Sequence, residues 1–251
     1  MSKEKKSKDL LIWEGYEWQV GERWGLMHPG KTECWYDDSA VEIVGDELHL
    51  HTHHNPVTID GKESPIGVGL INCTTKFGYG RYDIDIKLPK GPCLWPAFWM
   101  WAFESWPPEI DVFEGYSNKR GSYTNFSKFH EFIMGKFWRV QTNVHLGKVP
   151  KNYSIGAKSH WLSWTSPDKV FNKYSLEWYK DEVNILFNDK LVRKITDESV
   201  LEQLRGKDMN VIINNGIQKE YVNLVDKKFK STMICKNFRY SNIIKTIEDE
   251  K

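Results

Sequence analysis

Short segments in which apolar and polar side chains alternate recur along the chain, and they constrain its fold more than any other feature. Strand side chains alternate between two faces with period two, so these segments predict strands, whereas residues 197–204 alone have a helical pattern. No internal repeat or linker divides the 251 residues. We therefore predict one all-β domain, a sandwich of two antiparallel sheets. Its clearest strand segments are residues 82–88, 94–101, 109–114, 140–146, 174–178, 183–187, 209–214 and 233–240.

One of these segments carries three acids within six residues, Glu109, Asp111 and Glu114. On a regular strand Glu109 and Asp111 share a face, but Glu114 would enter the core, where an unpaired carboxylate is costly. One extra residue at Val112-Phe113, a β-bulge, would turn both apolar side chains inward and return Glu114 to the face of the other acids. The segment thus predicts a bulged strand with three carboxylates on one surface.

Such a surface is typical of enzymes that cleave glycosidic bonds with retention of configuration. One carboxylate attacks the anomeric carbon and another protonates the leaving oxygen, from about 5 to 5.5 Å apart. Crowding also keeps one of the carboxyl groups protonated near neutral pH. The alternative is an exposed edge strand with solvated acids. For residues 82–88 we predict an ordinary strand with two faces, a simpler interpretation, because their alternation contains two acids only and continues with Lys87.

Aromatic side chains are numerous, with 12 Trp, 11 Tyr and 12 Phe. Residues 94–101 place Trp95, Trp99 and Trp101 on one strand face and further apolar side chains on the other. One face must pack in the core. The indoles on the other face predict a sugar-binding platform, because the apolar faces of pyranose rings stack on aromatic rings.

Two further segments contain tryptophans outside regular strand patterns. Residues 13–36 read as an irregular segment over the domain, in which Trp35 either lines a substrate cleft or covers the core. Residues 151–170 read as a loop, with Trp161 and Trp164 as candidates for the cleft wall.

A polar row follows the acids. The strand predicted at residues 140–146 puts Gln141, Asn143 and His145 on one face and apolar or β-branched side chains on the other. A single histidine is usually structural, but this one belongs to a row that fits beside the acids. We therefore predict that all three contact the substrate.

Neither the cysteines nor the histidines predict a metal centre. His51 and His53 share a strand face, but histidines at strand ends are more often solvated. The four cysteines form no CxxC pair, and we expect buried free thiols. They are Cys34, Cys73, Cys93 and Cys235. We expect no cofactor.

The ends of the chain differ in composition from the middle. We expect a disordered Lys-rich tail at residues 1–12, a single catalytic domain at 13–241 and a charged tail at 242–251. No apolar run approaches the roughly 20 residues of a membrane span, and none forms a signal-peptide core. The net charge is +1 and the charged residues are scattered along the chain, so no basic patch indicates a nucleic-acid site. We expect a monomer. Location stays open between a cell interior, a virus or phage, and a secreted enzyme whose leader this chain lacks.

In their order along the chain, these segments resemble glycoside hydrolase family 16 over about residues 13–240. The landmarks are Gly80-Arg81-Tyr82, residues 94–100, the acid segment, His145, Tyr174 and Glu177-Trp178. The resemblance implies a concanavalin-like β-jelly roll with an open cleft on its concave sheet. It also implies that Glu109 is the nucleophile, Asp111 its hydrogen-bonding helper and Glu114 the general acid/base, with Trp95 and Trp99 at sugar subsites.

The five-residue step from Glu109 to Glu114 is similar to the bulged branch of that family, which includes laminarinases and enzymes acting on agar, porphyran and carrageenan. The residues after Glu114 depart from the usual laminarinase pattern. We expect an endo-acting retaining β-glycanase, with β-1,3-glucan as first substrate, mixed-linkage β-glucan second and marine galactan third. A transglycosylase and a non-catalytic glycan-binding module are the alternatives. Relatives carry a structural Ca²⁺, although no motif here indicates one.

Overall fold

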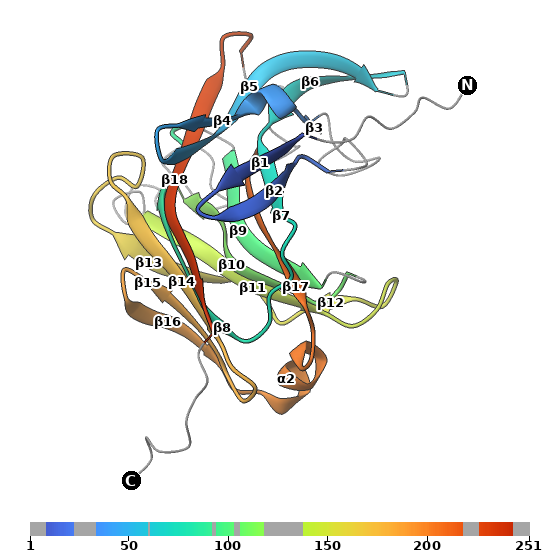
Figure 1. Ribbon diagram of the computed structural model, residues 1–251, viewed down its shortest axis with the longest axis vertical. Helices are drawn as coiled ribbons and strands as arrows, with labels where there is room; N and C mark the ends of the chain where they lie inside the picture. The colour runs from blue at the N-terminus through green and yellow to red at the C-terminus, as the bar shows by residue number, and fades with distance from the viewer. Residues whose placement is uncertain are drawn as a thin grey trace, which may run out of the picture.

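The computed structural model describes residues 9–22, 34–59, 61–91, 94–102, 106–117, 138–217 and 226–242. These residues form a sandwich of two nine-stranded sheets (Figure 1). In spatial order the first sheet contains β1 (Leu10–Trp13), β2 (Tyr16–Val20), β7 (Leu70–Cys73), β17 (Met209–Ile217), β9 (Leu94–Ala102), β10 (Glu109–Ser117), β11 (Trp138–Leu146) and β12 (Tyr153–Ser154). The ninth strand, β13 (Lys158–Ser163), also pairs with β11.

The second sheet is mixed, which corrects the prediction of two wholly antiparallel sheets. Its order is β16 (Lys190–Ile195), β15 (Val183–Phe187), β14 (Asn172–Trp178), β8 (Gly80–Lys87), β18 (Lys230–Ser241), β5 (Glu47–Ile59), β6 (Lys62–Val68) and β3 (Cys34–Tyr36), with β4 (Val41–Val44) on β5. Strands β4 and β6 both run antiparallel to β5, and β3 runs parallel to β6. The 3₁₀ turn η1 (Asp38–Ala40) therefore joins β3 to β4 without reversing the chain.

The core lies between the two sheets and is built from the apolar faces of their strands. In β8, Tyr82, Ile84 and Ile86 are buried, whereas the acids between them face outward. Arg81 forms ion pairs with two of the outward acids of this sheet, Asp83 at 2.9 Å and Glu177 at 2.6 Å. The simpler interpretation of residues 82–88 is thus confirmed: this strand has one buried face and one ion-paired face.

The helix predicted at residues 197–204 is present as α2 (Glu198–Leu204). Asp197 caps it, because its carboxylate accepts hydrogen bonds from the backbone N–H and the hydroxyl of Ser199. Val200, Leu201 and Leu204 are buried. No helix within the described ranges is long and apolar enough to cross a membrane.

Short edge strands extend the fold beyond the predicted segments. Strand β1 begins at Leu10, so residues 10–12 belong to a hairpin with β2 and not to a tail. Residues 151–170 contain β12 and β13, where a loop was expected. Backbone pairing forms these strands with little burial, since Leu10 and Ile12 are 58% and 69% exposed.

Three of the predicted thiols are free and buried, as expected: Cys34, Cys73 and Cys235. Cys93 lies outside the described residues. The imidazoles of His51 and His53 bind different carboxylates, Glu42 at 2.8 Å and Asp37 at 2.7 Å. Each ring is therefore part of its own hydrogen-bonded pair.

Candidate active site

The predicted β-bulge is present in β10. The register of β10 shifts between Asp111 and Phe113 against β9, and between Asp111 and Glu114 against β11. The extra residue allows two consecutive apolar side chains to point into the core. The fully buried side chains of this segment are Ile110, Val112 and Phe113. Glu114 consequently returns to the side of the sheet that carries Glu109 and Asp111.

The sheet arranges the acids in rows with residues of neighbouring strands, because side chains directly opposite each other on antiparallel strands share a face. We call this side of the first sheet, away from the core, the acid face. From β17 through β9 and β10 to β11 (Figure 1), its rows are Asn210, Trp101, Glu109 and His145; Ile212, Trp99, Asp111 and Asn143; and Asn214, Ala97, Glu114 and Gln141. These rows unite ten polar and aromatic positions from four separate strands.

Trp95 joins this site through Glu114, because its side chain forms a hydrogen bond with that carboxyl group. Trp35, in contrast, lies in β3 of the second sheet, where its Nε1 donates to the carbonyl of Asn55 at 2.8 Å. Its neighbour Tyr36 packs with Trp95 against a small buried cluster. Trp35 does not belong to the acid face, and its contact with a substrate stays a prediction.

Glu109 is held by an aromatic donor that the sequence did not single out. The Nε1–H of Trp106 donates to Glu109 Oε2 at 2.5 Å, from the connection between β9 and β10. Burial, and next the charge of Asp111, raise the pKa of Glu109 well above its usual range. The hydrogen bond from Trp106 acts in the opposite direction, because it stabilises the carboxylate. The only sign of this donor in the sequence is that an aromatic residue stands three positions before the first acid.

Asp111 is the most enclosed of the three acids, with 3% of its surface exposed. Burial, followed by the charge of Glu114, raises its pKa well above the usual range. A hydrogen bond with Glu109 and the positive charge of Arg193 lower it. Its Oδ2 is buried and lies 3.5 Å from His145 Nε2. Asp111 is thus placed to tune Glu109 from the adjacent row.

Burial also raises the pKa of Glu114, while hydrogen bonds from Trp95 and Asn143 lower it. Because Asp111 is buried and Glu109 and Glu114 are only partly exposed, full ionisation of these neighbouring carboxyl groups is unfavourable. A carboxyl group that keeps its proton near neutral pH can act as a general acid.

Asn143 positions His145. The Oδ1 of Asn143 accepts the N–H of Val144 at 3.0 Å, which orients the amide so that Nδ2 points to His145 Nε2 at 3.1 Å. The same Nε2 lies 3.5 Å from Asp111 Oδ2 and 3.8 Å from Glu109 Oε1. The imidazole is therefore held between the amide and the acids.

Ligand atoms of Glu109, Asp111 and His145 all lie within 4.8 Å of one another. Two carboxylate oxygens and an imidazole nitrogen are donors that a divalent cation accepts. His145 Nε2 and Glu109 Oε2, however, are already engaged by Asn143 and Trp106. A cation would have to displace these bonds, and the expectation that the chemistry needs no cofactor stays a prediction.

The tryptophans of β9 are held in place by their neighbour strand. Trp99 Nε1 donates to Asn214 Oδ1 at 2.8 Å, and Asn214 Nδ2 reaches the carbonyl of Trp95 at 3.4 Å. The Trp99 and Trp101 rings are 5.7 Å apart at 70°. Asn214 lay in a predicted strand, but its role was missed because nothing in the sequence pairs residues 99 and 214. Fixed, half-buried indoles beside the acids form a preorganised apolar surface.

A β-sandwich whose bulged acid strand lies between a strand of such indoles and a strand with a polar row has the architecture of a polysaccharide-acting protein. The model of glycosyl hydrolases family 16 matches residues 31–219, and the chain belongs to this family. The two-sheet jelly roll implied by the sequence is accordingly the fold of this chain.

Individual relatives are distant. The chain is 21% identical to "Endo-1,3-1,4-beta-glycanase ExsH" of Rhizobium meliloti over 188 residues, 69% of this chain and 37% of that protein. It is 31% identical to "Beta-1,3-glucan-binding protein" of Penaeus monodon over 122 residues, 46% of this chain and 31% of that protein. The chain thus spans well under half of either relative. The catalytic domain of an endo-1,3-beta-glucanase (laminarinase) from Thermotoga petrophila superimposes with a TM-score of 0.70 at 19% identity, covering 93% and 94% of the two chains.

Proposed function

We propose that this protein is an endo-acting, retaining β-glycanase whose first substrate is β-1,3-glucan, with mixed-linkage β-1,3/1,4-glucan next. The observation that carries this proposal is the bulge in β10, because it returns Glu114 to the face of Glu109 without exposing the core. A sheet that only bound glycans would need the indoles but not three carboxyl groups gathered on one face.

In the first step, Glu109 attacks the anomeric carbon and forms a covalent glycosyl ester. The bond from that carbon to the leaving oxygen breaks, and the oxygen takes the proton of Glu114. In the second step, Glu114 removes a proton from water, the water oxygen attacks the same carbon, and the ester bond to Glu109 breaks. Two inversions give net retention.

Opposing effects act on Glu109: burial and the charge of Asp111 raise its pKa, whereas the hydrogen bond from Trp106 favours the carboxylate form that an attacking group must have. Burial raises the pKa of Glu114 and favours the protonated form that a general acid needs. Asp111, through its hydrogen bond with Glu109, orients the nucleophile and does not itself bond to the sugar.

The substrate ranking is supported by the names of relatives, which include a 1,3-1,4-β-glycanase, and by the family's laminarinase structures. Trp95, Trp99 and Trp101 would stack on glucosyl rings on the β9 side of the acids, with Gln141, Asn143 and His145 on the β11 side. A marine galactan remains third in this ranking.

The shrimp relative's name favours a second candidate function, non-catalytic β-1,3-glucan binding. In that case the acid face would retain a polysaccharide without cleaving it. A transglycosylase with the same residues is a variant of the first proposal. It would make longer products at high oligosaccharide concentration.

Replacing either reacting acid tests the proposal. We expect Glu109→Gln and Glu114→Gln to lose at least about 100-fold in turnover, because one removes the nucleophile and the other the proton donor. Purified proteins would be incubated with laminarin, lichenan, curdlan, agarose, porphyran and carrageenan, and products separated by size. Asp111→Asn should lose as much or less.

The matched control is Glu63→Gln, an exposed acid of β6 in the second sheet. It should cleave as the unaltered protein does. Full activity of Glu109→Gln would refute the mechanism. If one polymer retards the unaltered protein in an affinity gel and no polymer yields products, the non-catalytic binding function would be supported in place of the enzyme.

A further inference from the structure

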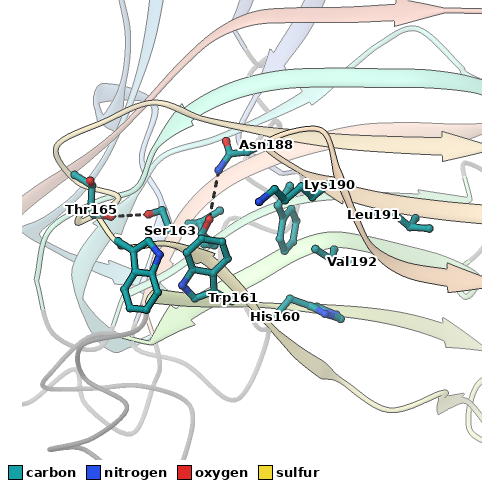
Figure 2. Close-up of a pocket in the computed structure, with 11 residues that line it drawn as sticks. His160, Trp161, Ser163, Thr165, Asn188, Lys190, Leu191 and Val192 are labelled. Atoms are coloured by element: carbon teal, nitrogen blue, oxygen red, sulfur yellow. Dashed lines mark hydrogen bonds between the residues drawn. The ribbon is translucent and has the colours of Figure 1, made fainter.

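A cavity of about 470 Å³ opens where β13 of the first sheet meets the end of β15 and the start of β16 in the second (Figure 2). Its size lies in the range of small-molecule sites, about 300–1,000 Å³. Its walls include Trp161, Trp164, Phe187, Lys190 and Leu191. None of these residues belongs to the rows of the acid site.

Two exposed indoles dominate the rim of this cavity. Trp161 is 37% exposed and Trp164 is 69% exposed, and their ring centroids are 5.6 Å apart at an interplanar angle of 62°. Lys190 Nζ lies 5.8 Å from the Trp161 ring, on the rim of the same cavity. Large aromatic side chains left in water contribute little to the core, so neighbouring ones on a rim indicate a binding surface.

The remaining lining combines apolar side chains with a few polar groups and is nearly uncharged. Of the described residues that line the cavity, Lys190 alone is charged at neutral pH. Burial lowers the pKa of His160 to about 4, which makes its imidazole neutral. Ser163 and Asn188 add a hydroxyl and an amide, each bonded to a backbone carbonyl (Figure 2). Aromatic faces beside neutral hydrogen-bonding groups suit a polyhydroxylated ligand better than a strongly charged one.

The strand register places Trp161 on the side of the first sheet that carries the acids. Gln141, which lies opposite Glu114, lies opposite Ser159 of β13 on its other side. Trp161, two residues further, lies opposite Arg139 and shares the face of Ser159. Two strand spacings separate β10 from β13, roughly 10 Å. A chain that crosses the sheet from Glu114 over Gln141 therefore reaches the indole of Trp161.

We propose that Trp161 and Trp164 form a distal glycan site that holds the same polysaccharide chain whose glycosidic bond lies at the acids. The occupant is a neutral β-glucan segment, so this assignment rests on the proposed function. The site would favour long chains over short ones, because only a long chain contacts the acids and the two indoles together.

The double variant Trp161→Ala/Trp164→Ala tests this site. We expect kcat/KM on laminarin to fall about tenfold through a higher KM, while kcat/KM on short laminari-oligosaccharides stays unchanged. In the inactive Glu109→Gln background, affinity-gel retardation by the polymer should weaken. Trp161→Phe should retain most of the binding that Trp161 provides. The control Ile43→Ala, which replaces an exposed apolar side chain on β4, should behave as the unaltered protein.

Failure of this proposal can be told from failure of the proposed function. If the unaltered protein cleaves laminarin and the double variant matches it on long chains, the distal site is refuted and the enzyme stands. If no polymer is cleaved, the affinity gel alone tests the site. Retardation of the unaltered protein that the double variant loses supports the site, whereas equal migration of the two proteins refutes it. The unaltered protein could also form a dimer that the double variant converts to a monomer, while cleavage and retardation by the glycan stay unchanged. That result would assign the two indoles to contacts between copies of the chain and would overturn the proposal.

Discussion

At the scale of single residues, the state of Glu109 depends on a donor from outside its strand and on the charge of a neighbouring acid. Trp106 donates to its carboxylate from the preceding connection, and Asp111 lies one row away on the same face. Asn143, on the neighbouring strand, holds Nε2 of His145 toward the acids. The acids could be found from their spacing, whereas these supporting contacts depend on how connections and neighbouring strands are placed.

Trp106→Phe removes the indole donor and retains an aromatic ring. Because the hydrogen bond lowers the pKa of Glu109, its loss raises that pKa, and ionised Glu109 then appears only at higher pH. We expect the acidic limb of the kcat/KM profile to move to higher pH. Hydrogen bonds to charged groups contribute about 1.5–3 kcal/mol, so activity below the optimum should fall about tenfold or more.

Tyr240→Phe is the matched control, since it removes another aromatic donor whose acceptor is the carbonyl of Tyr79. Its pH profile should equal that of the unaltered protein. An unmoved acidic limb in Trp106→Phe would show that the indole does not control the ionisation of Glu109.

At the scale of elements, the site depends on β11 as much as on β10, and β11 is tied to the second sheet. Arg193 of β16 is buried, and its Nη1 donates to the carbonyl and hydroxyl oxygens of Thr142 at 2.9 and 3.0 Å. Its Nη2 donates to the carbonyl of Gly156 at 3.2 Å. Thr142 directly precedes Asn143, so this buried cation fixes the strand that carries the polar row.

Arg193→Met should lower stability, because it removes the donor to the buried carbonyl and hydroxyl oxygens of Thr142, at a cost of about 1–3 kcal/mol each. For a domain of this size each kcal/mol corresponds to roughly 2–4 °C in Tm, so we expect a fall of about 4–10 °C. Thermal unfolding monitored by circular dichroism measures it. Arg205→Met, which removes an exposed partner of Glu198, is the control and should change Tm little. Equal melting of both variants would contradict the role of Arg193.

Strand prediction from the sequence succeeded where burial alone decides the pattern. The bulge in β10 and the two faces of β8 and β9 follow from which side chains avoid water. Strands β1, β12 and β13 were missed because backbone pairing at sheet edges forms them, with many side chains left exposed. Both residues of β12 are exposed, so no hydrophobic pattern could mark it.

At the scale of the whole molecule, the strand order assembles the site from distant parts of the chain. Strand β17 lies beside β9 and supplies Asn214 to Trp99, across 115 positions of sequence. Side-chain alternation gives the face of each strand but not its neighbour, so the rows across the sheet could not be predicted. The same limitation hid the parallel pairing of β3 with β6.

The stereochemistry of the first product tests the central claim most directly. Proton NMR of a laminarin digest, recorded before mutarotation, distinguishes the two anomers of the newly formed reducing end. Two displacements at one carbon, first by Glu109 and then by water, predict that the β-anomer appears first. Initial formation of the α-anomer would mean a single displacement by water and would contradict the assignment of Glu109 as nucleophile.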